Sequence, residues 1–176
     1  TWVQIGADID GEAGGDWSGY SVSLSSDGTI VAIGAYYNDG NGSNSGHVRV
    51  YEDSSGTWVQ IGADIDGEAA EDLSGWSVSL SSDGSTVAIG APYNDGNGSY
   101  SGHVRIYTYL NSTWSRSALN KDIDGEAMDD FSGYSVSLSS DGTIVAIGAP
   151  YNDGNGSYSG HVRIYENVSG TWTKIG

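Results

Sequence analysis

The chain has 176 residues, of which 23 are Asp or Glu and only 6 are Lys or Arg, so its formal net charge is −17. A surface this acidic repels nucleic-acid phosphates and anionic membranes, and we expect neither a nucleic-acid partner nor membrane insertion. The absence of cysteine excludes disulfides and thiol chemistry. A hydrophobic content of 37% is enough for one core, and no apolar run approaches the ~18 residues that span a bilayer.

The sequence consists of three copies of one unit. Residues 1–56 and 57–112 align without a gap and are identical at 42 of 56 positions. The third copy, 113–170, carries a two-residue insertion, and a fragment of a fourth copy, TWTKIG, ends the chain at 171–176. A fixed period of this length indicates a repeat architecture. We therefore expect a single repeat domain over 1–176, with 171–176 as a closing outer strand.

Each copy contains four strand-like runs, described here in chain order for the first. In GYSVSLS (19–25), apolar residues alternate with serines, as in a half-buried strand. TIVAIGA (29–35) is continuously apolar and suits burial on both faces. GHVRVY (46–51) alternates again. The fourth run, led by Trp, is TWVQIG, and for this blade it is supplied by 57–62 at the start of the next copy. Turn-forming SSDG, YNDGNGS and EDSSG separate the runs, and no segment shows the helical period.

Four short antiparallel strands in a repeat of about 56–58 residues predict an all-β fold of β-propeller-type blades. We expect the buried second strand to lie nearer the axis and the Trp-bearing fourth strand toward the outside. Three blades do not close a ring, since closed propellers have typically four to eight. The expected partners are therefore other copies of the chain or further blades of a longer one, and a head-to-tail filament is one such assembly. The surplus TWVQIG at 1–6 fits the outer strand of a preceding blade.

An acidic series recurs in the loop that leads from the fourth strand into the next blade. It reads DIDGEAGGD, DIDGEAAED and DIDGEAMDD, with acids at its first, third, fifth and ninth positions. Alternate carboxylates followed by a later one can wrap Ca²⁺, which takes six to eight oxygen ligands. The competing interpretation is a solvated acidic turn. The candidate ligands for a Ca²⁺ cofactor are Asp8, Asp10, Glu12, Asp16, Asp64, Asp66, Glu68, Asp72, Asp122, Asp124, Glu126 and Asp130.

A second loop, NDGNGS, joins the second and third strands. Asn-Gly turn chemistry explains it, and we prefer that interpretation to a metal site. Successive connections of an antiparallel meander alternate between the two ends of the sheet, so this loop and the acidic loop should share one rim. The second-choice metal or turn residues are Asp39, Asn41, Ser43, Asp95, Asn97, Ser99, Asp153, Asn155 and Ser157.

Two short motifs recur at fixed places and carry a family resemblance. The first reads Trp17-Ser18-Gly19, Leu73-Ser74-Gly75 and Phe131-Ser132-Gly133, and the second reads Gly34-Ala35-Tyr36, Gly90-Ala91-Pro92 and Gly148-Ala149-Pro150. The sequence thereby resembles the FG-GAP repeat of integrin α-subunit propellers and of microbial and algal surface proteins. The resemblance implies a β-propeller and an extracellular or cell-surface location. In that family calcium usually binds a hairpin between the first two strands. Here that connection is only Ser-Asp-Gly, too short to wrap an ion, so the site is not carried over.

No residue stands out as catalytic. The three histidines, His47, His103 and His161, occupy the same strand position, each two residues before an Arg. Catalysis needs different groups converging at one place, whereas here each blade repeats one pair. We therefore expect these residues to pack or to link blades, and we do not expect an enzyme.

The most consistent function is a non-enzymatic, extracellular scaffold, structural or adhesive, rigidified by Ca²⁺. The alternative is a lectin-like glycan binder that uses aromatic residues of the rim, namely Tyr37, Tyr93, Tyr100, Tyr151 and Tyr158. Sequons that would carry N-linked glycans in a secreted glycoprotein occur at Asn41, Asn97, Asn111, Asn155 and Asn167.

Overall fold

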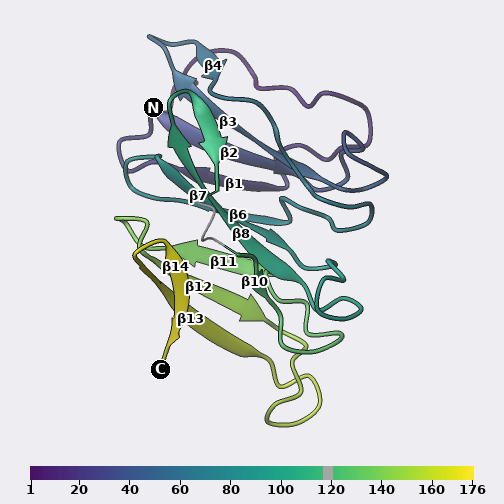
Figure 1. The fold of residues 1–176 in the computed structure, drawn as a ribbon. Coiled ribbons are helices and arrows are strands. Elements are labelled where there is room, and N and C mark those ends of the chain that lie inside the picture. Colours follow the sequence, from purple (N-terminus) through teal and green to yellow (C-terminus); the bar gives the residue numbers. More distant parts are fainter. Residues whose placement is uncertain (117–120) are drawn as a thin grey trace.

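The computed structural model describes residues 1–116 and 121–176. Within these residues it contains strands and turns but no helix, and therefore no helix that could cross a membrane. The strands form three twisted antiparallel sheets stacked along the molecule, and the first two sheets each take their fourth strand from the start of the next repeat (Figure 1). The prediction of an all-β fold with propeller-type blades is confirmed.

Each blade is a four-stranded meander in sequence order. The strands of blade 1 are β1 (Ser21–Leu24), β2 (Ile30–Ala35), β3 (His47–Asp53) and β4 (Trp58–Gln60). Those of blade 2 are β6 (Ser77–Leu80), β7 (Thr86–Ala91), β8 (His103–Leu110) and β9 (Thr113–Ser115). Those of blade 3 are β11 (Ser135–Leu138), β12 (Ile144–Ala149), β13 (His161–Val168) and β14 (Thr171–Ile175). Two short strands, β5 (Ile65–Asp66) and β10 (Ile123–Asp124), pair with β3 and β8.

The strand register sorts apolar and small polar side chains onto opposite faces of each sheet. In blade 1, Val22 pairs with Ile33 and Leu24 with Val31, which places these four on one face. The alternating serines point to the other face, where Ser23 Oγ accepts a hydrogen bond from the backbone N–H of Leu80 in blade 2 (2.9 Å). The period-two pattern therefore sets which side of a blade meets its neighbour.

The first strand of each blade lies where the three sheets converge, and the second strand, which we expected nearer the axis than the fourth, lies next to it. β1 packs against β6, and β6 packs against β11, so the first strands lie where the three sheets converge. The physical reason is the meander itself, because its first strand is necessarily a sheet edge. The second strands β2, β7 and β12 lie one place out, where strands cover them on both sides.

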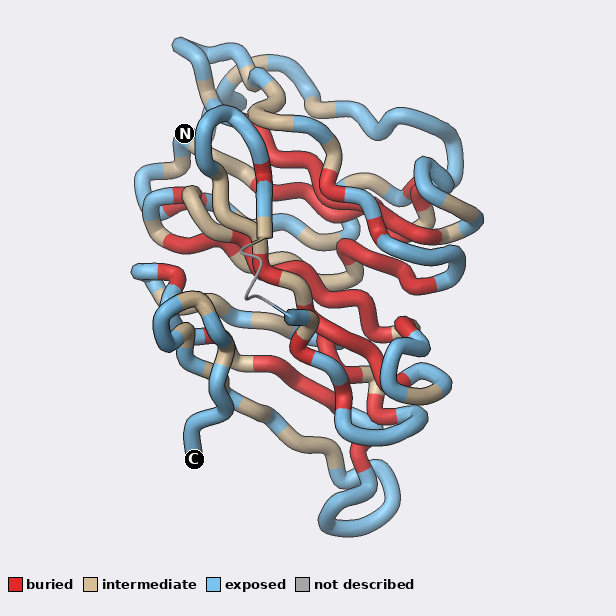
Figure 2. The backbone as a smooth tube through the Cα atoms, viewed as in Figure 1, coloured by how far each residue is buried: buried red, intermediate tan, exposed pale blue. Residues whose placement is uncertain are grey.

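The cores lie between blades rather than within them. One cluster contains Val48 and Val50 of blade 1 together with Val87 and Ile89 of blade 2. A second cluster joins blade 2 to blade 3 through equivalent positions, including Val104, Ile106, Val145 and Ile147. Figure 2 shows the buried backbone concentrated in the strands of the stack, with the connecting loops exposed. Each blade is therefore stabilised mainly by its neighbours, as in other repeat proteins.

The two motif glycines meet at the blade interface. A Cβ on Gly34 of the second motif would lie 2.2 Å from the carbonyl oxygen of Gly75, the glycine of the first motif in the next blade. Gly90 and Gly133 repeat the contact, at 2.0 Å. Gly75 and Gly133 also have positive φ, 85° and 88°, which a Cβ disfavours. The two motifs therefore contain glycine because the backbones of consecutive blades approach closely at these positions.

Residues 1–6 are not part of a strand. The carbonyl oxygen of Ile5 accepts a hydrogen bond from Trp58 Nε1 (3.0 Å), and Ile61 accepts the equivalent bond from Trp114 (2.9 Å). Relative to blade 1, the segment 1–6 therefore lies where the end of an outer strand lies relative to blade 2.

Candidate functional site

The interblade loops 8–16, 64–72 and 122–130 and the β2–β3, β7–β8 and β12–β13 loops lie side by side, and we call this surface the loop rim. Asn41 Nδ2 donates to the carbonyl oxygen of Gly67, and Asn97 Nδ2 donates to that of Gly125, both over 2.8 Å. The loops gather on one side of the stack, at the right in Figure 1. All the acids predicted as ligands lie on this rim, but they have different surroundings.

The last acid of each series is buried and closes its own loop. Asp72 Oδ2 accepts hydrogen bonds from the Ala69 backbone N–H (3.2 Å) and from Asn94 Nδ2 (2.9 Å), and burial raises the pKa of its carboxyl. The same bonds recur at Asp16 and Asp130. These three carboxylates therefore hold the two rim loops together and are turned away from solvent.

The glutamates at the fifth position of the series are paired with arginine, and so is Asp122 at the first position. The other two first-position acids accept hydrogen bonds from glutamine side chains instead, Asp8 from Gln4 and Asp64 from Gln60. Arg105 on β8 donates from Nε and Nη2 to the two oxygens of Asp122 (3.0 and 2.8 Å), and its Nη2 also contacts Glu68. Arg116 pairs with Asp122 as well. One guanidinium thus bridges the loop before blade 2 and the loop after it. Burial alone would raise the pKa of Asp122, but the hydrogen bond and charge of Arg105 outweigh it and hold the pKa below its usual value.

The same clamp recurs in the other blades in simpler forms. In blade 1, Arg49 Nη1 lies 3.8 Å from Glu12, and its Nη2 donates to the carbonyl oxygen of Asp10 (2.7 Å). In blade 3, Arg163 pairs with Glu126. The arginines that follow the histidines are therefore structural links between a strand and the loop before it.

Two clusters bring a carboxylate, an imidazole and a second carboxylate within 4.8 Å of one another. They consist of Glu12, His47 and Asp64, and of Glu68, His103 and Asp122. Each combines acids of two successive loops across one blade. Burial lowers the pKa of His103 to about 4, against the opposing charge of Asp122, so this imidazole is neutral at pH 7.

These clusters fit Ca²⁺ poorly. Ca²⁺ prefers six to eight oxygen ligands, whereas each cluster offers an imidazole, and Arg105 already neutralises the carboxylates of the second one. The acids at the third position of the series, Asp10, Asp66 and Asp124, are exposed and belong to neither cluster. Although the Asp124 side chain is exposed on one side, the surrounding protein partly desolvates its carboxyl group, and this desolvation and the charge of Asp122 raise its pKa. A cation bound nearby would favour the carboxylate form.

The side chains of the NDGNGS loops act as turn acceptors. Asp39 Oδ1 accepts from the Asn44 backbone N–H (2.7 Å), and Asp95 and Asp153 repeat the bond to Tyr100 and Tyr158. Ser43 Oγ donates to Glu71 (3.2 Å). Four sequon asparagines, Asn41, Asn97, Asn111 and Asn155, are exposed, and Asn167 is half-buried.

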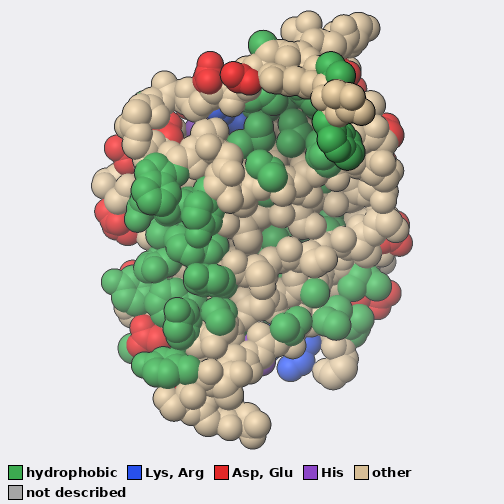
Figure 3. Space-filling view, turned by 180° about the vertical axis from the view of Figure 1, so that it is seen from behind, with side chains coloured by type: hydrophobic (Ala, Val, Ile, Leu, Met, Phe, Trp, Pro, Cys, Tyr) green, Lys and Arg blue, Asp and Glu red, His purple; other side chains and the backbone are tan. Residues whose placement is uncertain are grey.

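An aromatic strip runs along the loop rim through all three blades. Its contacts pass from Trp17 to Tyr36, through Tyr20 to Trp76, on to Tyr134 and Tyr151, and end at Tyr158, with ring centroids 4.4 to 6.4 Å apart. Figure 3 shows a column of hydrophobic side chains on this side of the molecule. Of the five predicted rim tyrosines, the structure joins Tyr93, Tyr100, Tyr151 and Tyr158 through Phe131, and Tyr37 contacts Trp17.

The strip includes residues that the sequence analysis did not select. Trp17 and Phe131 begin the first motif in two of the copies, where the other copy has Leu73, and Tyr20, Trp76 and Tyr134 stand three residues after the first residue of the motif in every copy. The signal that could have found them is the aromatic residue that directly follows the motif glycine in all three copies.

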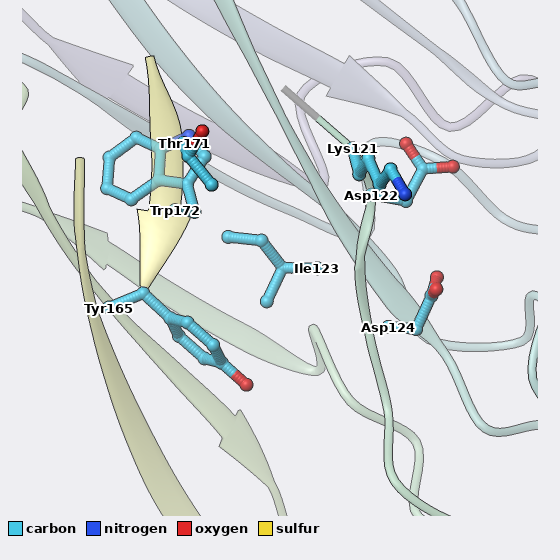
Figure 4. A pocket seen from close by; sticks show the side chains of 7 residues that line it. All are labelled: Lys121, Asp122, Ile123, Asp124, Tyr165, Thr171 and Trp172. Atoms are coloured by element: carbon cyan, nitrogen blue, oxygen red, sulfur yellow. The ribbon is translucent and has the colours of Figure 1, made fainter. Parts of the chain in front are cut away.

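A groove between the interblade loop and the outer hairpin recurs in each blade. The largest copy has a volume of about 520 Å³ and is lined by Lys121, Asp122, Ile123, Asp124, Tyr165, Thr171 and Trp172 (Figure 4). In Figure 4 the Ile123 side chain points toward Trp172 and Tyr165, while the carboxylates of Asp122 and Asp124 point away from them. Equivalent residues line the copies in blades 1 and 2. The groove is therefore a repeated architectural feature.

Stacked four-stranded meanders, joined by loops that clamp one blade to the next, define an all-β repeat protein with propeller-type blades. The FG-GAP repeat model matches residues 7–51, 63–107 and 115–165, which is most of the chain. The chain belongs to the FG-GAP repeat family. Among curated proteins, none matches this sequence.

Solved structures with a similar fold are much longer proteins. One is a protein assigned as a 6-phosphogluconolactonase from Bacteroides uniformis, with a TM-score of 0.59 and 14% identity over 89% of this chain and 39% of that one. Another is hydrazine synthase from Kuenenia stuttgartiensis, with a TM-score of 0.53 and 10% identity over 99% of this chain and 38% of that one. A third is Sqt1 from Saccharomyces cerevisiae, with a TM-score of 0.54 and 13% identity over 90% of this chain and 35% of that one. The chain spans less than two fifths of each, and at these identities the likeness shows the fold alone.

Proposed function

We propose that this chain is a non-enzymatic scaffold module, structural or adhesive, of an extracellular or cell-surface protein. The observation that carries the proposal is the repetition of the Arg–carboxylate clamp, since Arg49, Arg105 and Arg163 each link a strand to an interblade loop. Groups that recur in every blade and are used to hold blades together serve architecture, whereas catalysis needs one asymmetric constellation.

The strong negative charge and the exposed sequons favour an extracellular location for such a scaffold. The test is immunolabelling of intact, unpermeabilised cells of the source organism with an antibody raised against residues 1–176. We expect labelling at the surface, and brief protease treatment of whole cells should remove it. Labelling that requires permeabilisation would overturn the proposed location.

The aromatic strip favours a second candidate, a lectin-like glycan binder. Trp17 and Tyr158 expose 59% and 70% of their surface at the two ends of the strip, and flat aromatic rings suit the apolar faces of sugars. Saturable binding on a glycan array, lost in Trp17→Ala and in Tyr158→Ala, would favour this candidate. Unchanged binding in both variants would assign the strip to packing between blades.

As part of the scaffold proposal, we infer that Ca²⁺ rigidifies the interblade loops by binding at the acids in the third position of each series, Asp10, Asp66 and Asp124. What supports it is that these exposed carboxylates take no part in the arginine clamps or in the hydrogen bonds that close the loops. Ca²⁺ would complete its six to eight oxygen ligands with backbone carbonyls and water. The two clusters that contain histidine are not proposed as calcium sites.

A further inference from the structure

The cluster of Glu12, His47 and Asp64 in blade 1 combines three segments that are far apart in the sequence. Glu12 belongs to the interblade loop 8–16, His47 is the first residue of β3, and Asp64 directly precedes β5. Each side chain offers one ligand atom, and these three atoms lie within 4.8 Å of one another. The set therefore consists of one imidazole nitrogen and two carboxylate oxygens.

The pairing of β5 with β3 places two of these side chains relative to each other. The strands align His47 with Asp66, which brings Asp64, two residues earlier, to the same side of the sheet as His47. Gln60 Nε2 donates to Asp64 Oδ1 (2.6 Å) and orients that carboxylate. His47 and Asp64 are therefore held in place, whereas Glu12 stands on a loop with 43% of its side chain exposed.

The imidazole of His47 is buried and has no hydrogen-bond partner among the residues that the structure describes. Only 2% of its side chain is exposed, and its Nδ1 faces Glu12, whose Oε2 lies 3.8 Å away, beyond hydrogen-bond distance. Nearly all buried polar groups in proteins are satisfied by protein, water or an ion, because an unpaired one is costly. The two flanking carboxylates make a cation the fitting partner for this ring.

Blade 2 holds a cation at the equivalent place. There the guanidinium of Arg105 contacts Glu68 and donates from Nε and Nη2 to Asp122, between the same two loop carboxylates. The equivalent Arg49 of blade 1 is turned differently, since its Nη2 donates to a backbone carbonyl oxygen of the preceding loop (2.7 Å) and its Nε is buried without a hydrogen-bond partner. Arg49 therefore does not neutralise Asp64, the counterpart of Asp122.

The donor set selects the class of metal. Ca²⁺ and Mg²⁺ take oxygen ligands, whereas an imidazole nitrogen with carboxylate oxygens suits Zn²⁺ and related first-row transition metals. Three protein ligands and a water complete a tetrahedral Zn²⁺ site, with ligand atoms about 3.3 Å apart, so the cluster has to contract around the ion. Glu12 can supply this movement, because its side chain is partly exposed and its contact with Arg49 is long, 3.8 Å.

We propose that Glu12, His47 and Asp64 bind one divalent transition-metal ion of the Zn²⁺ class. The ion links the loop before blade 1 to β3 and to the loop after blade 1, as Arg105 links the corresponding loops of blade 2. The second cluster that contains histidine is not included, because Arg105 already neutralises its carboxylates. The proposal does not depend on the scaffold function, and its ion is distinct from the calcium proposed at the third-position acids.

The test is isothermal titration calorimetry of the purified 176-residue chain with ZnCl₂, in excess CaCl₂ so that sites made only of oxygen ligands are filled. The wild type should bind one Zn²⁺ per chain. Glu12→Gln and His47→Gln should each weaken binding by more than about tenfold, since even the loss of an outer partner of a metal ligand costs that much. Glu126→Gln and His161→Gln make the same changes in blade 3, where the described residues form no such cluster, and should bind like the wild type.

The imidazole NMR signals identify the ligand. Zn²⁺ should shift the ring signals of His47 and leave those of His103 and His161 in place. Glu12→Gln alters a partly exposed side chain, so its metal-free spectrum should match the wild type, and its loss of binding then does not reflect unfolding.

Two results would overturn the proposal. One is the absence of saturable Zn²⁺ binding in the presence of Ca²⁺. The other is undiminished binding in both Glu12→Gln and His47→Gln, which would place Zn²⁺ on other acids of the loop rim. Neither result bears on surface labelling or on stabilisation by Ca²⁺, so these proposals fail separately.

Discussion

At the scale of single residues, the acids of one short motif have different partners and different structural roles. Asp72 is a buried acceptor for an asparagine and a backbone N–H, while Glu68 and Asp122 face Arg105 from two different loops. What decides the role of each carboxylate is which neighbour the fold brings to it, because burial without a partner is costly for a charge.

The Arg105 clamp leads to a stability prediction with an internal control. Arg105→Gln removes a cation that is shared by two carboxylates, and we expect it to lower the free energy of unfolding by about 1–3 kcal/mol, since Asp122 is left partly buried without its main partner. Arg163→Gln breaks a contact to Glu126, whose side chain is 48% exposed, and should cost less than about 1 kcal/mol. Urea unfolding of both variants provides the comparison, and equal losses would contradict the bridging role.

The Ser-Asp-Gly turns offer a second residue-scale prediction. Ser139 Oγ donates to Asp141 Oδ1 (2.6 Å), and the N–H and hydroxyl of Thr143 donate to the same oxygen, which lowers the pKa of Asp141 from 3.8 to about 2. A lowered carboxyl pKa stabilises the fold above pH 3.8, and this contribution is lost as the pH falls toward 2. Ser139→Ala should raise the Asp141 midpoint toward 3.8 in a carboxyl NMR titration, with Asp83 as the unchanged reference. A midpoint that does not move would contradict the assigned cause.

At the scale of elements, the motif glycines allow the backbones of consecutive blades to approach closely. Gly90→Ala should destabilise by more than about 2 kcal/mol, because the added Cβ would lie 2.0 Å from the carbonyl oxygen of Gly133 and the backbones would have to separate. Gly148→Ala is the matched control, since there the nearest atom is the Ser135 hydroxyl, which can rotate. Thermal unfolding of both variants should show the larger loss at Gly90. Equal losses would mean that the glycine is needed for its own strand and not for the interface.

Strand positions and the repeat could be predicted from sequence because both depend on local periodicity. Alternation in SVSL and the apolar run of TIVAIGA correspond to β1 and β2, and the proximity of the rim loops follows from meander topology. The partners of the acids could not be predicted, since Glu68 and Asp122 meet through Arg105, which lies 37 residues after the first and 17 before the second. The innermost position of β1 could not be predicted, because hydrophobicity reports burial but not which sheet edge faces the neighbouring blades.

At the scale of the whole molecule, charge repulsion opposes the packing of the blades against one another. The net charge is −17, and the acidic interblade loops of successive blades lie along one side of the stack. Repulsion of this kind is screened by salt, with a Debye length of about 10 Å at 0.1 M. Salt should therefore raise the melting temperature of the chain, because it screens the repulsion between these loops, and differential scanning calorimetry over a NaCl series measures the shift.

Calcium can be separated from screening by matching ionic strength. Millimolar CaCl₂ should raise the melting temperature more than NaCl of equal ionic strength, because an ion bound at the exposed third-position acids stabilises only the folded chain. The excess should disappear in Asp10→Asn/Asp66→Asn/Asp124→Asn, which leaves the Arg clamps and the buried acids such as Asp72 intact. Differential scanning calorimetry after chelation measures both shifts. If NaCl reproduces the whole effect of CaCl₂, the acidic rim is only screened, and rigidity rests on the interblade cores and the arginine clamps.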